Sequence, residues 1–346
     1  MQNGTTAPDR ILVWGAGAIG GTVGAFLKRA GHDVTFVDVV EDHAAAIADT
    51  ARGLSITGPV ETFRVSAPAF VPAEVTGQWD HVFLCVKAQH TAEAARALLP
   101  HLSPGGYVLS LQNGLCEGII AEIAGTERVL GAFINFGADW LAPGEILYGN
   151  RGAFVLGELD GTTTDRIRAL HQLIRGGFEP EAIVTDDIQS FLWGKLGYAS
   201  LLFAQALGQL GIADCLARPE LLPLWRALGG EVGAVATAIG VRQRGFNGFD
   251  PAAFVPGATE EQARRSIDAI VAFNRPNAKT HSGIWRDLAV RKRRTEVDVQ
   301  VLPVVETGAA HGVDCPKCRK LTAMIHQIEE GTRPMTDDNL LELLRA

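Results

Sequence analysis

The stretch Ile11-Leu12-Val13-Trp14-Gly15-Ala16-Gly17-Ala18-Ile19-Gly20 decides the fold class of this chain. Its apolar start predicts a short buried strand, and the glycines in G-x-G-x-x-G spacing predict a tight turn into a helix. Gly15 permits the turn, Gly17 lets the backbone approach phosphate oxygens, and Gly20 lets the helix pack against the strand. The helix N-terminus offers N–H groups and partial positive charge to an anion. The stretch therefore predicts a loop that binds the pyrophosphate of a dinucleotide.

A carboxylate ends the second predicted strand. Val34-Thr35-Phe36-Val37 has the β-branched and aromatic composition of a strand, and Asp38 follows it. In this fold an acid at that place accepts hydrogen bonds from the ribose hydroxyls of NAD and repels the extra phosphate of NADP. No arginine follows within residues 39–42. We predict a preference for NAD over NADP; the alternative is that Asp38 only caps a turn.

Length and composition are those of an ordinary globular protein with room for two domains. The chain has 346 residues, of which 47% are hydrophobic and 20% charged. Its formal net charge of −8 disfavours nucleic acid and anionic membrane as partners. The basic run Arg291-Lys292-Arg293-Arg294 is the local exception. We interpret it as a solvated helix face, with a role toward a phosphate or an acidic substrate as the alternative.

Neither a membrane span nor a disulfide framework is predicted. No apolar run reaches the length of a bilayer, and residues 1–10 lack the apolar core of a signal peptide, so we expect a cytoplasmic protein. The five cysteines are odd in number and scattered, which fits a reducing compartment. Cys315 and Cys318 have C-x-x-C spacing, but no second pair completes four zinc ligands, so no metal is expected. They start a predicted helix, where they could oxidise.

The pattern along the chain predicts two domains. Strands and helices alternate from Arg10 to about Asp186, as in a parallel doubly wound sheet of Rossmann type, with a β-hairpin inserted between residues 54 and 70. Thr91 is expected to cap a helix that runs to Leu99. Further strands are expected at 81–86, 107–111, 129–136, 153–156 and 183–185. Helices alone are expected afterwards, at 188–210, 219–239, 260–273, within 284–312, at 318–330 and at 339–344. We therefore predict a dinucleotide-binding domain over 1–186, an all-α substrate and dimerisation domain over 187–346, and ligands in a cleft between the two.

Lys195 is the strongest candidate for proton chemistry. It lies in the most apolar predicted helix, where a lysine must snorkel, pair with an acid or face a cavity. Burial favours the neutral amine and so eases release of a proton, which reduction of a carbonyl requires. The alternative is a structural lysine at the helix surface. Glu296, at the start of a later helix, is the matching acid, and Asp298 competes with it.

Two further polar residues follow predicted strands. Lys87 and Asn113 stand at strand carboxyl ends, the edge at which this fold holds its cofactor. Asn113-Gly114 is also an ordinary turn pair, so a purely conformational role is the alternative for that residue.

Together these motifs resemble, in order and over nearly the whole chain, those of the ketopantoate reductase family (2-dehydropantoate 2-reductases), within the 6-phosphogluconate-dehydrogenase-like group. The segments that carry the resemblance are 15–20, Val86-Lys87-Ala88, Gln112-Asn113-Gly114, Trp193-Gly194-Lys195-Leu196, Thr295-Glu296-Val297-Asp298 and 308–321. The resemblance implies that Lys195 is the general acid and that Glu296 anchors it and the substrate. It also implies that Lys87 and Asn113 hold the cofactor and the reacting carbonyl, that Ser282 binds substrate, and that the protein is a homodimer.

The chain departs from the family pattern where substrate is held. Ala199 replaces an asparagine one turn after the lysine, Phe203 replaces a further polar residue, and residues 300–303 replace an Asn-Gly pair. These changes predict a more apolar pocket. We therefore expect an NAD-dependent oxidoreductase acting on a small 2-oxo or hydroxy compound. The alternatives are a true NADPH-dependent ketopantoate reductase and a non-catalytic NAD-binding sensor.

Overall fold

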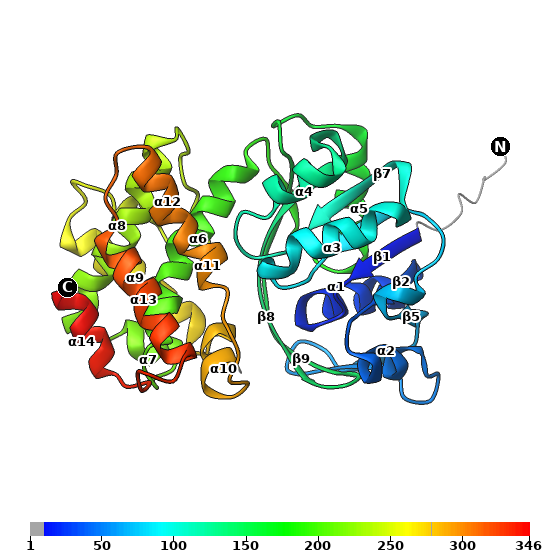
Figure 1. Cartoon of the computed structure of the whole chain (residues 1–346), viewed down its shortest axis with the longest axis horizontal. Helices are drawn as coiled ribbons and strands as arrows, with labels where there is room; N and C mark the ends of the chain where they lie inside the picture. The colour runs from blue at the N-terminus through cyan, green and yellow to red at the C-terminus, as the bar shows by residue number, and fades with distance from the viewer. Residues whose placement is uncertain (1–9, 278) are drawn as a thin grey trace. The chain divides into compact units, whose positions relative to one another are not determined.

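The computed structural model describes residues 10–277 and 279–346, which form two compact units. The first ends at Ile188 and the second begins at Gln189 (Figure 1). The segment 1–10, in which no signal peptide is expected, lies outside the described residues except for Arg10, which begins the first strand. Along 10–277 and 279–346, no helix combines the length and hydropathy needed to cross a bilayer.

The first unit opens with the predicted strand, turn and helix. Strand β1 (Arg10–Trp14) leads into helix α1 (Ala18–Arg29), and β2 (Asp33–Val37) pairs with β1 in parallel. Gly31, with φ of 100°, reverses the chain after α1, as expected for a glycine at a helix end. The remaining strands of this unit are β3 (Leu54–Thr57), β4 (Phe63–Val65), β5 (Ala69–Phe70), β6 (Trp79–Leu84), β7 (Leu102–Ser110), β8 (Val129–Ala142), β9 (Glu145–Glu158) and β10 (Ile183–Val184). Its other helices are α2 (Glu41–Ala48), α3 (Thr91–Leu98), α4 (Glu117–Ala124) and α5 (Asp165–Gly177).

The ten strands in the described part of the chain form one sheet in the order β4-β3-β9-β8-β7-β6-β1-β2-β5, with β10 beside β9. The chain leaves β1 toward β2 and β5 and later returns to place β6 on the other side of β1. The strand order therefore reverses between β1 and β6, and such a switch point is where doubly wound sheets bind their ligands.

The sheet is mixed rather than wholly parallel, which corrects the parallel pattern expected over this unit. Strands β8 and β9 form a long antiparallel hairpin, joined at the turn Pro143-Gly144, and β3 pairs with β4 as the predicted inserted hairpin. Both long strands extend beyond their predicted bounds. Register shifts interrupt the pairing between Asn135 and Ala142, and such irregularities hide the alternation by which a strand is recognised.

Helices cover both faces of this sheet. Ile11 and Val13 of β1 pack into one core with α1 and α5, whereas Leu12 and Trp14 are equally buried but point the other way. The ring centroid of Trp14 lies 6.2 Å from that of His101, which follows α3. Helices α3 and α4 lie side by side on this second face (Figure 1). Thr91 begins α3 and does not cap it, since its hydroxyl donates to the carbonyl of Ala88.

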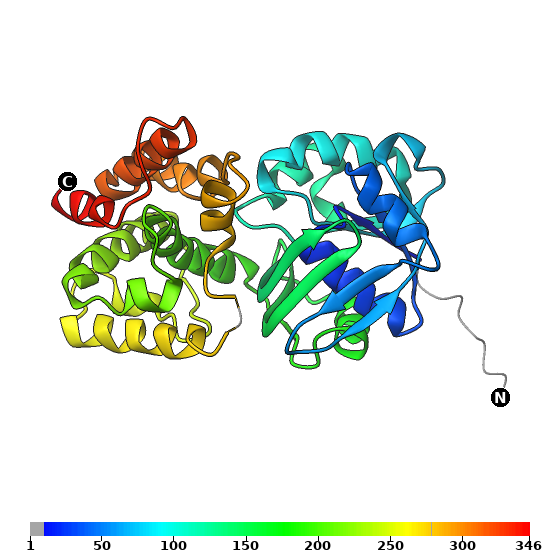
Figure 2. The same ribbon diagram turned by 90° about the horizontal axis from the view of Figure 1, so that it is seen from below.

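The second unit consists of helices and loops apart from one isolated bridge among its described residues (Figure 2). Its helices are α6 (Ile188–Gln205, beginning in the first unit), α7 (Ile212–Leu216), α8 (Leu222–Ala238), α9 (Glu260–Asn274), α10 (Gly283–Ala289), α11 (Val297–Gln300), α12 (Leu302–Ala310), α13 (Pro316–Glu329) and α14 (Asp338–Arg345). Helix α6 ends five residues before its predicted end at Leu210, because the side chain of Gln205 donates to the carbonyl of Leu210 and closes a turn. The short α7 was not expected.

Candidate functional site

The first glycine of the loop lies where three strands end. Gly15 has a φ of 99°, and its N–H donates to the carbonyl of Val37 at 2.8 Å. A Cβ added to Gly15 would lie 2.8 Å from the nitrogen of Val86, which follows β6. Only glycine combines this left-handed backbone with so close a neighbour, so the turn at the β1–β6 switch point requires it.

The other two glycines differ from each other in their surroundings. A Cβ at Gly20 would overlap the carbonyl of Gly15 and approach Cys85, so α1 packs against the strand ends only because that atom is missing. A Cβ at Gly17 would meet nothing within 4 Å. Gly15 and Gly20 are thus needed for the fold of the loop, whereas Gly17 faces open space, as a backbone that receives a phosphate must.

The N-terminus of α1 fits an anion. Among the described residues, no side chain caps this helix and no acid lies in its first turn. The first backbone bond of the helix runs from Gly21 to Gly17, which leaves Ala18, Ile19 and Gly20 as first-turn donors. Such N–H groups, with the partial positive charge of the helix end, suit the pyrophosphate of a dinucleotide.

Asp38 follows β2 on the same edge of the sheet. One of its carboxylate oxygens accepts the N–H of Val40 at 3.0 Å, and its own N–H donates to Phe70. One carboxylate oxygen of Asp38 therefore caps a turn, as the alternative interpretation expected. The residue after Asp38 is Val39, which is 78% exposed and carries no charge. Val40 and Phe70 are also exposed.

Lys87 and Asn113 also lie at this edge, each three residues beyond the last residue of its strand, β6 or β7. Both side chains are half-buried. Gln112 ties the two segments together, because its amide donates to the carbonyl of Val86 at 3.0 Å and to the hydroxyl of Thr91 at 2.8 Å. We had given Gln112 no role. A glutamine directly after an apolar strand was the signal, but its partners are distant in sequence.

Lys195 lies in the second unit, half-buried on α6. The helix around it is held by the loop that follows α8. Gln243 donates its side-chain amide to the carbonyl of Trp193 at 2.7 Å, and a Cβ at Gly194 would overlap the carbonyl of Arg244. Because Gly194 has no side chain, the backbone of Arg244 can pack against the turn of α6 that carries Lys195.

The two acids near the start of α11 have different environments. Glu296 is 5% exposed and occupies the N-cap position of α11. Thr295 holds it in place, since the N–H and hydroxyl of Thr295 both donate to Glu329 at 2.7 Å. Asp298 is exposed and pairs with His326 at 2.7 Å. Burial favours Glu296 over Asp298 as the acid of the site.

The expected substrate-binding residues take part in packing and capping. Ala199 is buried and Phe203 has no exposed surface. Ser282 caps α10 by accepting the N–H of Trp285 at 3.1 Å, and its hydroxyl donates to Gln205 at 3.3 Å. Ser282 thus has structural partners, and Phe203 lies fully buried in the second unit.

The basic run is not a helix face, contrary to our interpretation. Residues 291–294 form a loop between α10 and α11, in which Lys292 has a φ of 50°. Arg291 and Arg293 pair with Asp287, whose side chain is 1% exposed. Arg291 and Arg293 therefore neutralise a carboxylate that lies four and six residues before them and whose burial the sequence did not indicate.

Cys315 and Cys318 are both buried, at the start of α13. Burial and the nearby charge of Glu231 raise the pKa of Cys315 to about 11 and the pKa of Cys318 well above its usual range. Within 10–277 and 279–346, no cluster of His, Cys, Asp and Glu side chains has the arrangement of a metal site. These features mark structural thiols rather than reactive ones.

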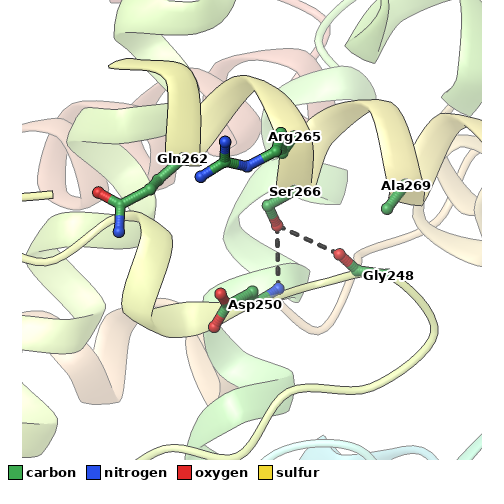
Figure 3. A pocket seen from close by; sticks show the side chains of 6 residues that line it. All are labelled: Gly248, Asp250, Gln262, Arg265, Ser266 and Ala269. Carbon is green, nitrogen blue, oxygen red and sulfur yellow. Dashed lines mark hydrogen bonds between the residues drawn. The ribbon is translucent and has the colours of Figure 1, made fainter. Parts of the chain in front are cut away.

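A surface hollow of about 300 Å³ lies on the second unit (Figure 3). Its lining is Gly248, Asp250, Gln262, Arg265, Ser266 and Ala269, none of which was expected in the site. The hydroxyl of Ser266 accepts the N–H of Asp250 and donates to Gly248, as Figure 3 shows, and Arg265 pairs with Glu261. These polar groups bind one another, so the hollow does not add to the site.

Two family profiles match the chain. Residues 11–161 match the profile described as "Ketopantoate reductase PanE/ApbA", and residues 187–329 match its C-terminal counterpart. The 2-dehydropantoate 2-reductase of Archaeoglobus fulgidus is 28% identical over 93% of this chain and 99% of its own length.

Solved structures agree with the profiles. A PanE/ApbA family ketopantoate reductase from Ralstonia eutropha JMP134 superposes with a TM-score of 0.78 at 27% identity, over 93% of this chain and 99% of its own. A D-mandelate dehydrogenase solved with NADH and anilino(oxo)acetate has a TM-score of 0.79 at 20% identity, with the same two coverages. The latter shares the fold.

Proposed function

This chain belongs to the ketopantoate reductase family, and we propose that it transfers hydride between NAD(H) and a small 2-oxo or 2-hydroxy compound. Membership makes it an oxidoreductase of the CH–OH/C=O type that uses a nicotinamide cofactor. The observation that carries the finer proposal is the N-terminus of α1 at the β1–β6 switch point, which no side chain of residues 10–277 or 279–346 caps, together with Asp38 on the same sheet edge.

Residues of the first unit would hold the cofactor, and we assign this role to residues 1–186. The N–H groups of Gly17 to Gly20 would receive the pyrophosphate. Asp38 would accept hydrogen bonds from the ribose hydroxyls, and its charge would repel an added phosphate there. Val39 and Val40 offer that phosphate no positive charge, which favours NAD over NADP. Lys87 and Asn113 would hold the nicotinamide half and the reacting carbonyl.

Residues of the second unit would donate and accept the proton of the reaction. We also assign substrate binding and dimerisation to residues 187–346. When bound, the nicotinamide ring supplies hydride to the carbonyl carbon or accepts it in the reverse direction. As the C=O π electrons move to oxygen, the ammonium of Lys195 gives that oxygen a proton; in the oxidising direction, the amine takes it back. The buried carboxylate of Glu296 would orient Lys195 and the substrate hydroxyl.

The residues expected to bind substrate favour a compound less polar than ketopantoate. Ala199 has no group with which to bind a hydroxyl or carboxylate, and the fully buried side chain of Phe203 has no polar group either. Ser282 keeps a hydroxyl, although its bonds to Trp285 and Gln205 limit its orientation. We therefore place the substrate among 2-oxo or 2-hydroxy compounds with an apolar side chain. We propose a cytoplasmic homodimer with neither nucleic acid nor membrane as partner.

A substrate panel tests the proposal. The purified protein is assayed with NADH or NADPH against 2-oxo acids that include ketopantoate, and with NAD or NADP against 2-hydroxy acids that include D-mandelate. We expect turnover with NADH or NAD, and less with the phosphorylated cofactors. Activity on ketopantoate with NADPH preferred would instead identify a true ketopantoate reductase. Tight NADH binding without turnover on any compound would identify a sensor.

A further inference from the structure

His43 is a buried histidine that contacts the glycine loop. It lies in the first turn of α2 and is 1% exposed. Its Nε2 is 2.9 Å from the carbonyl oxygen of Ala16, between the first two glycines of the loop. Its Nδ1 accepts the N–H of Gly144 at 2.9 Å and the indole N–H of Trp140 at 3.3 Å, both from the β8–β9 hairpin. One ring thus joins the loop, α2 and the hairpin turn.

The partners of His43 determine its tautomer. A backbone N–H and an indole N–H can only donate, so Nδ1 must present its lone pair to Gly144 and Trp140. The ring proton is therefore on Nε2, which donates to the carbonyl of Ala16. A carbonyl can only accept, so this arrangement satisfies all three partners at once.

This bond sets the direction of the next N–H group. The peptide between Ala16 and Gly17 is planar and trans, so its C=O and N–H point in opposite directions. His43 draws the carbonyl of Ala16 toward the buried side of the loop. The N–H of Gly17 must then point away from that side.

We propose that His43 is a positioning residue that aims the Gly17 N–H at the pyrophosphate of the cofactor and holds it there through the hairpin turn. The inference rests on the proposed NAD-binding function. It assigns His43 no contact with substrate or cofactor. Without the Nε2–H donor, the Ala16 peptide could rotate, and one phosphate donor would have to be reordered on binding.

Two substitutions separate the two ends of the ring. In His43→Asn the side-chain oxygen lies near the former Nδ1 and can still accept from Gly144, but no donor reaches Ala16. In His43→Gln the amide nitrogen reaches the former Nε2 position and can donate to Ala16, but the acceptor for Gly144 is lost. Each variant loses one side of the network, so we expect comparable falls in Tm.

NADH titration, followed by protein fluorescence, distinguishes the variants. We expect His43→Asn to raise the Kd for NADH about tenfold, the equivalent of one hydrogen bond of about 1.4 kcal/mol, and His43→Gln to raise it less than about threefold. Equal effects of the two variants on Kd, or none, would reduce His43 to a structural residue and overturn the proposal. If the unaltered protein fails to bind NADH, the proposed function fails instead.

A measurement without cofactor keeps the inference testable should either variant fail to fold. Nitrogen-15 NMR of the unliganded protein, labelled at histidine, reports which ring nitrogen carries the proton. We expect His43 to be protonated at Nε2 and not at Nδ1. A proton on Nδ1 would contradict the donation to Ala16 and overturn the proposal.

Discussion

Two helices of this chain, α1 and α13, begin at motifs typical of functional sites. They differ in whether the protein itself supplies acceptors for the backbone N–H groups of the first turn. Helix α13 begins at Cys315-x-x-Cys318, and Glu231 of α8 accepts the N–H groups of Lys317 and Cys318 at 2.8 Å each. Pro316 has no N–H, and Arg319 donates to Cys315, so every first-turn donor is accounted for. Helix α1 begins at the glycine loop without any side-chain cap from the described residues.

The difference shows what distinguishes a binding site from a structural helix end. Both ends carry the same partial positive charge. In α13 a carboxylate of the protein neutralises it, whereas in α1 the donors and the open space beside Gly17 are left for an anion from outside. Whether a helix N-terminus can bind an external anion thus depends on whether a carboxylate of the protein already occupies it.

The largest expected effect is a loss of turnover without a loss of cofactor binding. We assign cofactor binding to the N-terminus of α1 and proton transfer to Lys195 in the second unit. Lys195→Ala should lower kcat about 10²–10⁴-fold, the usual contribution of a positioned acid, and leave the Kd for NADH within about twofold. Lys195→Arg is the matched control, because arginine keeps the charge but does not release its proton. Stopped-flow turnover and fluorescence titration measure the two quantities. Undiminished kcat in Lys195→Ala would remove this residue from the mechanism.

Closing the open helix end should abolish binding without harming the fold. Gly17→Asp would give α1 its own carboxylate, as Glu231 gives one to α13, and should raise the Kd for NADH at least about 100-fold. Stability should stay equal or rise by up to about 1 kcal/mol, since Asp is a favourable N-cap. Urea unfolding and NADH titration check both halves, with Gly17→Asn as the uncharged control. Normal NADH affinity in Gly17→Asp would place the pyrophosphate elsewhere.

Opening the closed helix end should do the reverse. In Glu231→Gln one of the two N–H groups faces an amide NH2 instead of an oxygen, so stability should fall by about 1–3 kcal/mol. The Kd for NADH should not change. Glu330→Gln, at an exposed position at the end of α13, serves as a control with the same chemical change. A loss of NADH affinity without a loss of stability would contradict the contrast between the two ends.

A comparison within the loop itself concerns Gly20 and Gly17. Gly20→Ala should lower stability by about 1–3 kcal/mol, because the added methyl group overlaps the carbonyl of Gly15. Gly17→Ala should change it by less than about 1 kcal/mol, since that methyl group meets open space. Thermal unfolding of the two variants gives the comparison. Equal losses of stability would show that the two positions are packed alike.

The thiols at α13 offer a check by pH. Because burial, and then the charge of Glu231, raise the pKa of Cys315 to about 11, little thiolate should exist at pH 8. Alkylation by iodoacetamide should therefore be slow at pH 8 and accelerate only as the pH approaches 11. In Glu231→Gln the acceleration should begin at lower pH. Rapid alkylation of the folded protein at pH 8 would mean that the helix end activates its thiols after all.

Much of the fold could be predicted because the deciding signals are local. The loop from Gly15 to Gly20, the strand before it and the helix after it follow from ten adjacent residues. The insertion between residues 54 and 70 and the helical second half also have the predicted character. The long β8–β9 hairpin was underestimated because its register shifts break the alternation over residues 135–142.

The supporting contacts could not be predicted, because they join residues far apart in the chain. Glu231 accepts the N–H of Lys317, 86 residues later, and His43 accepts the N–H of Gly144, 101 residues later. Each partner looks ordinary in its own segment. Only the folded chain shows which charge or donor it meets.

The central claim is that the open end of α1, with Asp38 beside it, binds NAD. Parallel fluorescence titrations of the unaltered protein with NADH and with NADPH test it most directly. The account predicts saturable binding of both, with NADH at least about tenfold tighter because the carboxylate of Asp38 repels the additional phosphate. Tighter binding of NADPH, or no saturable binding of either, would contradict it.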